Sequence, residues 1–357
     1  MKRFVTRIRY PESISQIEVG SGIAAASEMR RIGKNYSSIH FIIDANVARL
    51  HGAGVLKALL GGSDFFALAA GENQKNIRKA EQILAWLHDS GADRKSLLVA
   101  VGGGVTTDLA GFAASTYMRG IDYISLPTTL VGQVDASIGG KTAINLGGTK
   151  NLAGTFYPPR RIVCDNAFLA TLRSAQIRDG LVEAVKIFAA RDAAAFRRHA
   201  ELLRSYVTGE NMSELIADAI RLKVAAVNAD PFERDLRRVL NFGHTTGHAY
   251  EAITRQSHGK SVAFGILVAL VISRRQAQLN AADFESIWVA ITQLYRKFAV
   301  AGIDAQALWE RIQHDKKKTG AKVNFVLLKR CGEHIVKSVN YPQFASALKE
   351  TRRLLEA

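Results

Sequence analysis

Three of the nine histidines of this chain lie within fifteen residues of one another. His244 and His248 are four residues apart and project from one face if their segment is helical, and His258 follows shortly. Neutral imidazole is a common zinc ligand, and catalytic zinc takes three protein ligands and leaves one position open. The spacing predicts a metal site that needs a carboxylate from elsewhere. Ordinary core or surface histidines on a helix are the commoner outcome for an isolated pair.

Glu183 is the candidate for that carboxylate. It shares a helix face with Lys186, and the surrounding segment 180–186 is otherwise apolar. Burying a carboxylate there is costly unless it is paired or bound to a metal. Two interpretations therefore remain open, a Glu–Lys ion pair and a metal ligand.

A glycine turn, residues 102–104, follows a β-type run and precedes a helical pattern. Glycines let backbone approach an anion, and a helix N-terminus supplies free N–H groups and partial positive charge. The segment is not G-x-G-x-x-G, so the alternative is a plain tight turn. Asp44 and Asn46 follow an earlier buried strand, where a carboxylate either accepts hydrogen bonds from a ribose or caps the next helix.

Cationic and amide side chains near glycine-rich loops or the histidine segment could bind a phosphate or a polyhydroxy substrate. The alternative for each lysine is a solvated surface position. The segment 135–142 ends in Gly-Gly-Lys-Thr but lacks the earlier glycine of a P-loop, and 315–318 is expected to be a solvated charge run. The candidates are Asp135, Lys141, Lys150 and Asn151 in loops, and Lys223, Arg237 and Asn241 leading into the histidines.

The elements that must position these residues divide the chain in two. Strands are predicted at 39–44, 96–101, 123–126 and 162–164, with helices at 76–89 and 108–116 between them. This alternation indicates a parallel sheet covered by helices on both faces. Helical periodicity dominates from 174 to 311, and a late strand is predicted at 323–328. We expect a nucleotide-binding α/β domain at 1–172 and a mostly helical domain at 173–357.

Length and composition agree with two soluble domains: 357 residues, of which 48% are hydrophobic and 22% charged. Two cysteines exclude a disulfide framework and indicate a reducing cytoplasm. No signal peptide is visible, and the longest apolar run, 262–272, is too short to cross a membrane. The net charge of +16 is scattered without a nucleic-acid motif, which favours a cationic pocket for an anionic small molecule over nucleic-acid binding.

Taken together, these residues resemble the 3-dehydroquinate synthase family of sugar phosphate cyclases. The matching blocks occur in the family's order and span nearly the whole chain. They are GGGVTTDLAGFAASTYMRG (102–120), PTTLVGQVDASIGGKTAIN (127–145), KNLAGTFYPP (150–159), GLVEAVK (180–186), LNFGHTTGHAYE (240–251), HGKSVAFG (258–265) and DKKK (315–318).

The resemblance implies an N-terminal NAD-binding domain and a helical C-terminal metal-binding domain in a homodimer. The metal, zinc or alternatively cobalt, would be held by Glu183, His244 and His258, which moves His248 to the substrate side. NAD would be held by Asp44, Asn46, Glu72, Lys75, Gly103, Gly104, Val105, Asp108, Thr128, Thr129, Lys150, Phe168 and Thr171. Arg119 would reach the substrate phosphate of the neighbouring subunit. The other substrate contacts would come from Asp135, Lys141, Asn151, Lys186, Lys223, Arg237, Asn241, His248 and one lysine of 316–317, for which we take Lys317.

The implied reaction converts 3-deoxy-D-arabino-heptulosonate 7-phosphate to 3-dehydroquinate in the shikimate pathway of aromatic amino acid biosynthesis. Departures from the family pattern occur at Thr106-Thr107, at 147–149, and at Pro231 and Asp235. They leave open a cyclase acting on sedoheptulose 7-phosphate, glucose 6-phosphate or an amino analogue, although Gly139-Gly140-Lys141, Asn241 and His248 favour the dehydroquinate type. The rivals are a metal-dependent polyol dehydrogenase, which would release NADH, and a basic nucleic-acid-binding or assembly protein without catalysis.

Overall fold

The computed structural model describes residues 3–10, 13–24, 31–300, 302–315 and 322–356. Two compact units divide the chain, Met1–Arg173 with Met212–Phe232, and Ser174–Asn211 with Glu233–Ala357. The segment Met212–Phe232, assigned from the sequence to the second domain, groups with the first unit because helix α9 (Ser213–Ala229) packs against strands β1 (Phe4–Arg9) and β2 (Ile14–Gly20).

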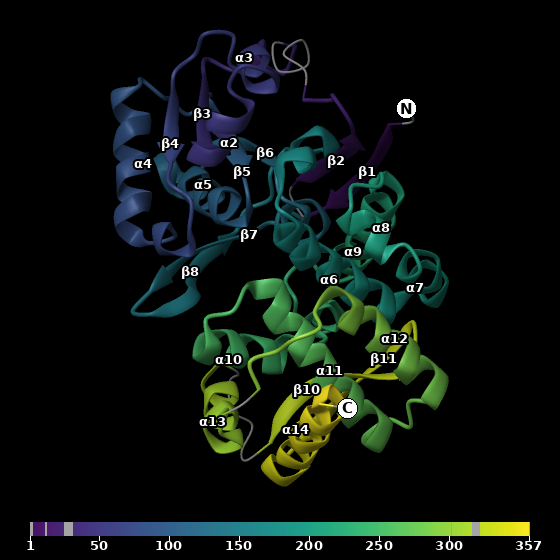
Figure 1. The fold of residues 1–357 in the computed structure, drawn as a ribbon. Coiled ribbons are helices and arrows are strands. Elements are labelled where there is room, and N and C mark those ends of the chain that lie inside the picture. Colours follow the sequence, from purple (N-terminus) through teal and green to yellow (C-terminus); the bar gives the residue numbers. More distant parts are fainter. Residues whose placement is uncertain (1–2, 11–12, 25–30, 301, 316–321, 357) are drawn as a thin grey trace. The chain divides into compact units, whose positions relative to one another are not determined.

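The first unit is built on a seven-stranded sheet in the order β1-β2-β9-β6-β5-β3-β4. Only β1 runs antiparallel to its neighbour, and the remaining pairs are parallel. The prediction of a parallel α/β unit is therefore confirmed (Figure 1). Besides β1 and β2, the strands are β3 (Ile39–Asp44), β4 (Phe65–Leu68), β5 (Leu97–Gly102), β6 (Asp122–Pro127) and β9 (Arg161–Asp165).

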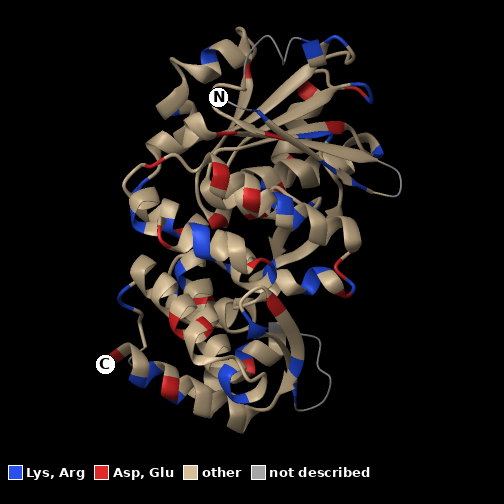
Figure 2. Ribbon diagram, turned by 90° about the vertical axis from the view of Figure 1, so that its right-hand side faces the viewer, with Lys and Arg blue, Asp and Glu red and all other residues tan. Residues whose placement is uncertain are grey.

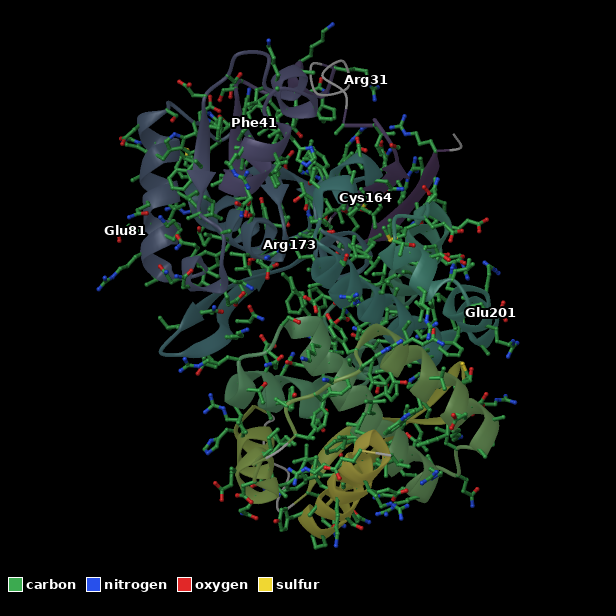
Figure 3. All side chains as sticks on the ribbon, viewed as in Figure 1. Arg31, Phe41, Glu81, Cys164, Arg173 and Glu201 are labelled. Carbon is green, nitrogen blue, oxygen red and sulfur yellow. The ribbon has the colours of Figure 1, made fainter. Side chains whose placement is uncertain are left out.

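Both faces of the sheet are covered, because alternate side chains of the buried strands enter two separate cores. Ile42, Leu98 and Ala100 pack with helices α4 (Ile77–Asp89) and α5 (Gly104–Thr116) on one face. Phe41, Val99 and Val101 pack on the other face with α2 (Ala45–His51), α3 (Val55–Leu60) and the turn η4 (Asn166–Thr171). Figure 3 shows Phe41 among the side chains of this interior, and Glu81 directed away from α4.

An antiparallel hairpin of β7 (Lys141–Leu146) and β8 (Thr149–Phe156) leaves the sheet (Figure 1). Lys141, Lys150 and Asn151 lie on its strands, so the prediction that they lie in loops is wrong. Almost every residue of β8 is exposed, and without a buried face the strand has no alternation of apolar and polar residues to reveal it.

The second unit is mostly helical, as predicted. Its helices are α6 (Ser174–Arg191), α7 (Ala193–Ala200), α8 (Leu203–Val207), α10 (His244–Thr254), α11 (His258–Gln276), α12 (Ala281–Leu294), α13 (Ala305–Asp315) and α14 (Tyr341–Glu356), with the turn η5 (Leu236–Asn241) before α10. The predicted late strand is present as β10 (Val323–Arg330), and β11 (Glu333–Val339), which the sequence did not predict, pairs with it antiparallel.

The apolar run Val262–Ile272 forms the interior of α11, where every residue is buried. Among the described residues, no helix combines the length and the apolar character needed to span a membrane. Lys and Arg occur on elements of both units and alternate with Asp and Glu (Figure 2).

Candidate metal centre and cofactor-binding edge

Glu183 and Lys186 lie on α6, whose middle is buried on all sides. The Glu183 side chain is completely inaccessible and that of Lys186 nearly so, and Lys186 Nζ lies 2.6 Å from Glu183 Oε2. The ion pair considered from the sequence is thus present. Neither carboxylate oxygen has a hydrogen bond of good geometry within the described part of the chain.

Two glycines let α11 approach its neighbours closely enough to complete the cluster. A Cβ on Gly265 would lie 1.9 Å from the carbonyl oxygen of Gly243, which precedes α10. A Cβ on Gly259 would lie 2.3 Å from the Cα of Asp179, one turn before Glu183 on α6. Side chains at these positions would push the helices apart. The glycines therefore position the histidines of α10 and α11 against the Glu183 carboxylate.

Glu183, His244 and His258 form a cluster whose donor atoms lie within 4.8 Å of one another. The Nε2 atoms of His244 and His258 lie 3.8 and 3.3 Å from Glu183 Oε1. His248 lies beside them, its ring centroid 5.1 Å from that of His244 and 5.9 Å from that of His258, but it is not one of the clustered donors.

Burial and the neighbouring charges shift the pKa values of all three residues of the cluster. Burial alone would raise the pKa of Glu183, but Lys186 and the two histidines outweigh it and hold that pKa well below the usual value. Burial, reinforced by Lys186, lowers the pKa of His244, which favours the neutral imidazole that metals bind. Burial would also lower the pKa of His258, but the adjacent carboxylates of Glu183 and Glu251 raise it to about 10. The ring is therefore protonated at neutral pH and must release a proton when it binds a metal.

The donor set fits a divalent transition metal. Lys186 pairs with Glu183 Oε2, whereas Oε1 faces the two imidazoles without a hydrogen bond of good geometry among the described residues. A buried oxygen of this kind is unfavourable, and a metal cation between it and the imidazoles would satisfy it. One carboxylate and two imidazoles match the ligands of catalytic zinc sites, which keep a further position open for substrate.

The second unit also holds four of the expected substrate residues. Besides Lys186 and His248 these are Arg237, buried in η5, and Asn241 at the end of that turn. Asn241 Nδ2 donates to Glu233 Oε1 at 2.6 Å, and Glu233 adopts a left-handed φ of 55°. Lys316 and Lys317 lie outside the described residues.

In the first unit, the expected NAD residues follow the carboxyl ends of five parallel strands. Parallel strands end at one edge of a sheet, and this is where open α/β sheets bind ligands. Asp44 and Asn46 follow β3, Glu72 and Lys75 follow β4, Gly103, Gly104 and Val105 follow β5 and lead to Asp108, Thr128 and Thr129 follow β6, and Phe168 and Thr171 follow β9.

The N-terminus of α5 at this edge is open to an anion. The helix begins at Gly104 after Gly103, and no side chain caps it. The neighbouring α2 differs, because Asp44 Oδ1 accepts hydrogen bonds from the N–H groups of Asn46 and Val47 at 2.8 and 3.3 Å. The capping role considered for Asp44 is thus observed. Phe168 is completely buried in the core.

A polar network links the edge to the hairpin. Lys75, which is buried, forms an ion pair with Asp108 and donates a hydrogen bond to Asn151. Burial raises the pKa of Asp108, although Lys75 opposes this shift. Asn145 Nδ2 donates to Glu72 Oε1 at 2.8 Å, and the N–H of Asn145 donates to the Lys75 carbonyl at 2.7 Å.

Besides Asn151, four further expected substrate residues lie in the first unit: Arg119, Asp135, Lys141 and Lys223. Lys223 on α9 pairs with Asp135 in the turn η3 (Gly132–Ala136), through both its carboxylate and its backbone carbonyl. Lys141 is exposed at the start of β7. Arg119 follows α5, is exposed and has a left-handed φ of 72°. Lys150, which was expected to bind NAD, is exposed on β8.

Two residues with no assigned role from the sequence take part in these arrangements. Asn145 bridges Glu72 and the Lys75 backbone, and Glu251 contacts His258. Both fall inside blocks that carry the family resemblance, and Glu251 lies seven residues after His244, two turns along the same helix face. That spacing is the signal that could have identified Glu251.

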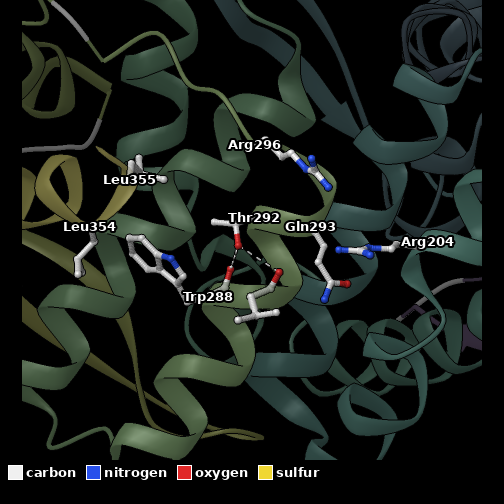
Figure 4. A pocket seen from close by; sticks show the side chains of 8 residues that line it. Arg204, Trp288, Thr292, Gln293, Arg296, Leu354 and Leu355 are labelled. Atoms are coloured by element: carbon white, nitrogen blue, oxygen red, sulfur yellow. Dashed lines mark hydrogen bonds between the residues drawn. The ribbon is translucent and has the colours of Figure 1, made fainter. Parts of the chain in front are cut away.

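A separate hollow of about 400 Å³ opens on the second unit (Figure 4). None of the predicted site residues that the structure describes lines this hollow. The Thr292 hydroxyl in its lining donates hydrogen bonds to the carbonyl oxygens of Trp288 and Val289 at 2.9 and 3.2 Å. The lining residues are Arg204, Trp288, Val289, Thr292, Gln293, Arg296, Leu354 and Leu355.

Comparison with protein families gives two adjoining matches. Residues 65–179 match the family described as 3-dehydroquinate synthase N-terminal, and residues 180–318 match 3-dehydroquinate synthase C-terminal. A 3-dehydroquinate synthase from Solibacter usitatus is 38% identical over 317 residues, which cover 87% of this chain and 89% of the relative.

Solved structures share the fold at lower identity. The 2-epi-5-epi-valiolone synthase of Streptomyces hygroscopicus subsp. jinggangensis, solved with NAD+ and Zn2+ bound, has a TM-score of 0.85 at 24% identity, covering 98% of this chain and 99% of that one. A 2-deoxy-scyllo-inosose synthase complexed with carbaglucose-6-phosphate, NAD+ and Co2+ has a TM-score of 0.82 at 22% identity, covering 97% and 99%.

Proposed function

The chain belongs to the 3-dehydroquinate synthase family, and we propose that it converts 3-deoxy-D-arabino-heptulosonate 7-phosphate to 3-dehydroquinate with elimination of phosphate. It is an enzyme of the lyase type. One observation carries the metal-dependent part of this proposal: Oε1 of the buried Glu183 has no hydrogen bond of good geometry among the described residues and faces the Nε2 atoms of His244 and His258, while Lys186 pairs with Oε2.

Glu183, His244 and His258 are the proposed ligands of the divalent metal, with zinc the preferred ion and cobalt the alternative. When bound, the metal and NAD would supply polarisation of a substrate oxygen and reversible oxidation of a ring hydroxyl. His244 provides a neutral imidazole because burial lowers its pKa. Lys186 holds a positive charge beside the ligands, where it stabilises negative charge that develops on the substrate.

We propose that NAD binds along the carboxyl edge of the sheet. The uncapped N–H groups at the start of α5, from Gly103 to Val105, would bind its diphosphate. The network of Lys75, Asp108 and Asn145 holds the β7–β8 hairpin against this edge and would orient the adjoining loops. The remaining residues proposed from the family resemblance lie at the ends of the same strands, except Lys150, which lies on β8.

Cationic and amide groups are the proposed contacts of the anionic substrate. Arg237 offers a planar guanidinium that can bind a phosphate or carboxylate through two hydrogen bonds, and Asn241 is oriented by Glu233. Lys223 is oriented by Asp135, and His248 offers a ring nitrogen beside the metal ligands for holding or moving a proton. Lys141 and Asn151 complete the proposed set.

The finer features of the enzyme are also proposals. We propose a homodimer in which Arg119 reaches the substrate phosphate of the neighbouring subunit. We propose that it acts in the cytoplasm in the shikimate pathway, which agrees with two buried free cysteines, Cys164 and Cys331. Burial raises the pKa of the Cys331 thiol to about 12, so it is inert at neutral pH.

The test is incubation of the chain with NAD, Zn2+ and the heptulosonate phosphate. We expect one phosphate released per substrate consumed, a product with the mass of dehydroquinate, and no accumulation of NADH. Phosphate release from sedoheptulose 7-phosphate but not from the heptulosonate would replace the proposed substrate. Accumulation of NADH with a polyol, without phosphate release, would indicate a dehydrogenase instead.

A further inference from the structure

Three polar side chains lie on one face of α10 over two helical turns. His244 begins the helix, His248 follows one turn later, and Glu251 one turn after that. The first is a proposed metal ligand and the second a proposed substrate residue. Glu251 has no role in the proposed function, yet its carboxylate is largely buried, with 13% of the side chain exposed. A buried carboxylate requires a partner.

That partner is His258, the first residue of α11. His258 Nδ1 lies 3.1 Å from Glu251 Oε2, and on the opposite side of the ring Nε2 lies 3.3 Å from Glu183 Oε1. The imidazole thus stands between two carboxylates, one on α10 and one on α6. Because the nitrogens point in opposite directions, the contact made by one determines what the other can do.

We propose that Glu251 is a positioning residue that orients His258 for metal binding. Once Nε2 of His258 has released its proton, the Glu251 carboxylate accepts the remaining proton on Nδ1 and fixes the tautomer in which Nε2 carries the free electron pair. That pair points toward Glu183, where the metal would lie. A carboxylate behind a ligating histidine fixes the ring and raises its basicity. This inference rests on the metal centre of the proposed function.

The other histidine is oriented differently. His244 Nδ1 lies 3.4 Å from the carbonyl oxygen of Phe242, a neutral acceptor at the long limit of a hydrogen bond. His244 is also more enclosed than His258, whose side chain is 38% exposed. The exposed ligand therefore has the charged orienting group, and we expect its geometry to depend on that group more than His244 depends on Phe242.

A second set of contacts holds the backbone beside His258. Asp179 Oδ1 accepts hydrogen bonds from Ser257 Oγ at 2.7 Å and from Tyr295 OH at 2.6 Å. Ser257 immediately precedes α11, so these bonds tie the start of that helix to α6. The main chain at His258 remains anchored without Glu251, which leaves ring orientation as the property that Glu251 controls.

The experiment measures Zn2+ affinity by competition with a chromogenic chelator on the full chain stripped of metal. Glu251→Ala removes the acceptor, and Glu251→Gln keeps an acceptor but removes the charge. We expect dissociation constants about 100-fold and about 10-fold above that of the unmodified chain, the range found for such outer partners. Glu285→Gln makes the same chemical change at an exposed position of α12 and should leave the affinity unchanged.

The absorption spectrum of the Co2+-loaded chain provides a second readout, which reports coordination geometry. We expect Glu251→Ala to change this spectrum, whereas a purely structural role would lower thermal stability and leave it as it was. Zn2+ affinity within twofold of the unmodified chain in Glu251→Ala would overturn the inference. If that variant does not fold, an unchanged affinity in Glu251→Gln overturns it. Absence of Zn2+ binding by the unmodified chain would overturn the metal centre itself, and this inference with it.

Discussion

Two regions differ in how their buried charged groups are neutralised. One is the carboxyl edge of the sheet in the first unit, and the other is the crossing of α6, α10 and α11 in the second. At the sheet edge, Lys75 pairs with Asp108, and Asn145 donates to Glu72. At the helix crossing, the completely buried Glu183 pairs with Lys186 through Oε2, but among the described residues Oε1 has no hydrogen bond of good geometry. The first arrangement is satisfied by the chain's own groups, whereas we propose that a metal cation completes the second. The buried carboxylate is therefore the argument for the proposed metal site, whereas the cofactor edge is proposed from topology.

The largest effect should follow from removing the unsatisfied carboxylate. Glu183→Gln replaces the charged ligand with a neutral amide, and we expect turnover to fall about 1,000-fold or more, because metal polarisation supplies several kcal/mol to the barrier. Steady-state phosphate release measures this loss. The matched control, Glu285→Gln, makes the same change at an exposed position and should keep full activity. Retained turnover in Glu183→Gln would remove the distinction between the two regions.

Breaking the satisfied network should have a smaller effect of a different kind. Lys75→Met leaves Asp108 and Asn151 without their cation, and we expect the NAD dissociation constant to rise about tenfold, or about 1.4 kcal/mol. Equilibrium binding of NAD checks this, with metal content unchanged. Lys57→Met, at an exposed position of α3, is the control. If Lys75→Met lost metal rather than NAD affinity, the two regions would not be independent.

The glycine packing of the second unit should be more sensitive than an open glycine of the first. Gly265→Ala places a methyl group 1.9 Å from a backbone oxygen, and overpacking of this kind costs about 1–3 kcal/mol of unfolding free energy. At Gly54 the nearest atom lies 3.8 Å from the added Cβ, so Gly54→Ala creates no overlap. It carries only the cost of a backbone at φ −109° and ψ −114°, which we expect to be smaller than that of the overlap at Gly265. Chemical denaturation of both variants measures the contrast, and equal stabilities would contradict it.

The smallest effect concerns pH. Burial and the neighbouring Asp122 raise the pKa of Tyr36 in the first unit to about 12, compared with about 10 in the unfolded chain. The folded state therefore keeps the proton that the unfolded state loses, so this contribution to stability is complete below pH 10 and is lost as the pH rises to about 12. Unfolding free energies measured across this range should fall less steeply in Tyr36→Phe. An identical slope would show that Tyr36 contributes nothing.

Much of the fold could be predicted because buried elements have a strong hydrophobic period. Strands β3, β5, β6 and β9 and helix α4 lie where the pattern indicated, within one or two residues. The exposed strand β8 had no such pattern, and the strand β11 is only partly buried. Helix α9 was expected among the helices of the second domain, because periodicity reveals a helix but not the surface against which it packs.

The site illustrates the same limit. Helical spacing pairs His244 with His248, yet the structure clusters His244 with His258 and Glu183, which come from three different helices. That cluster depends on helix crossings at Gly259 and Gly265, which local spacing does not encode. The resemblance to the family supplied the three residues. The spacing of Glu251 from His244 indicates a shared helix face, but its contact with His258 depends on the crossing of α10 and α11.

The most direct test of the central claim is anomalous diffraction at the zinc edge from crystals of the full chain grown with Zn2+. We predict one strong peak about 2.0–2.2 Å from a Glu183 carboxylate oxygen and from the Nε2 atoms of His244 and His258. Diffraction data collected at energies just below and just above the zinc absorption edge would establish whether the metal is zinc. A peak bound by other residues, or none at this cluster, would contradict the account.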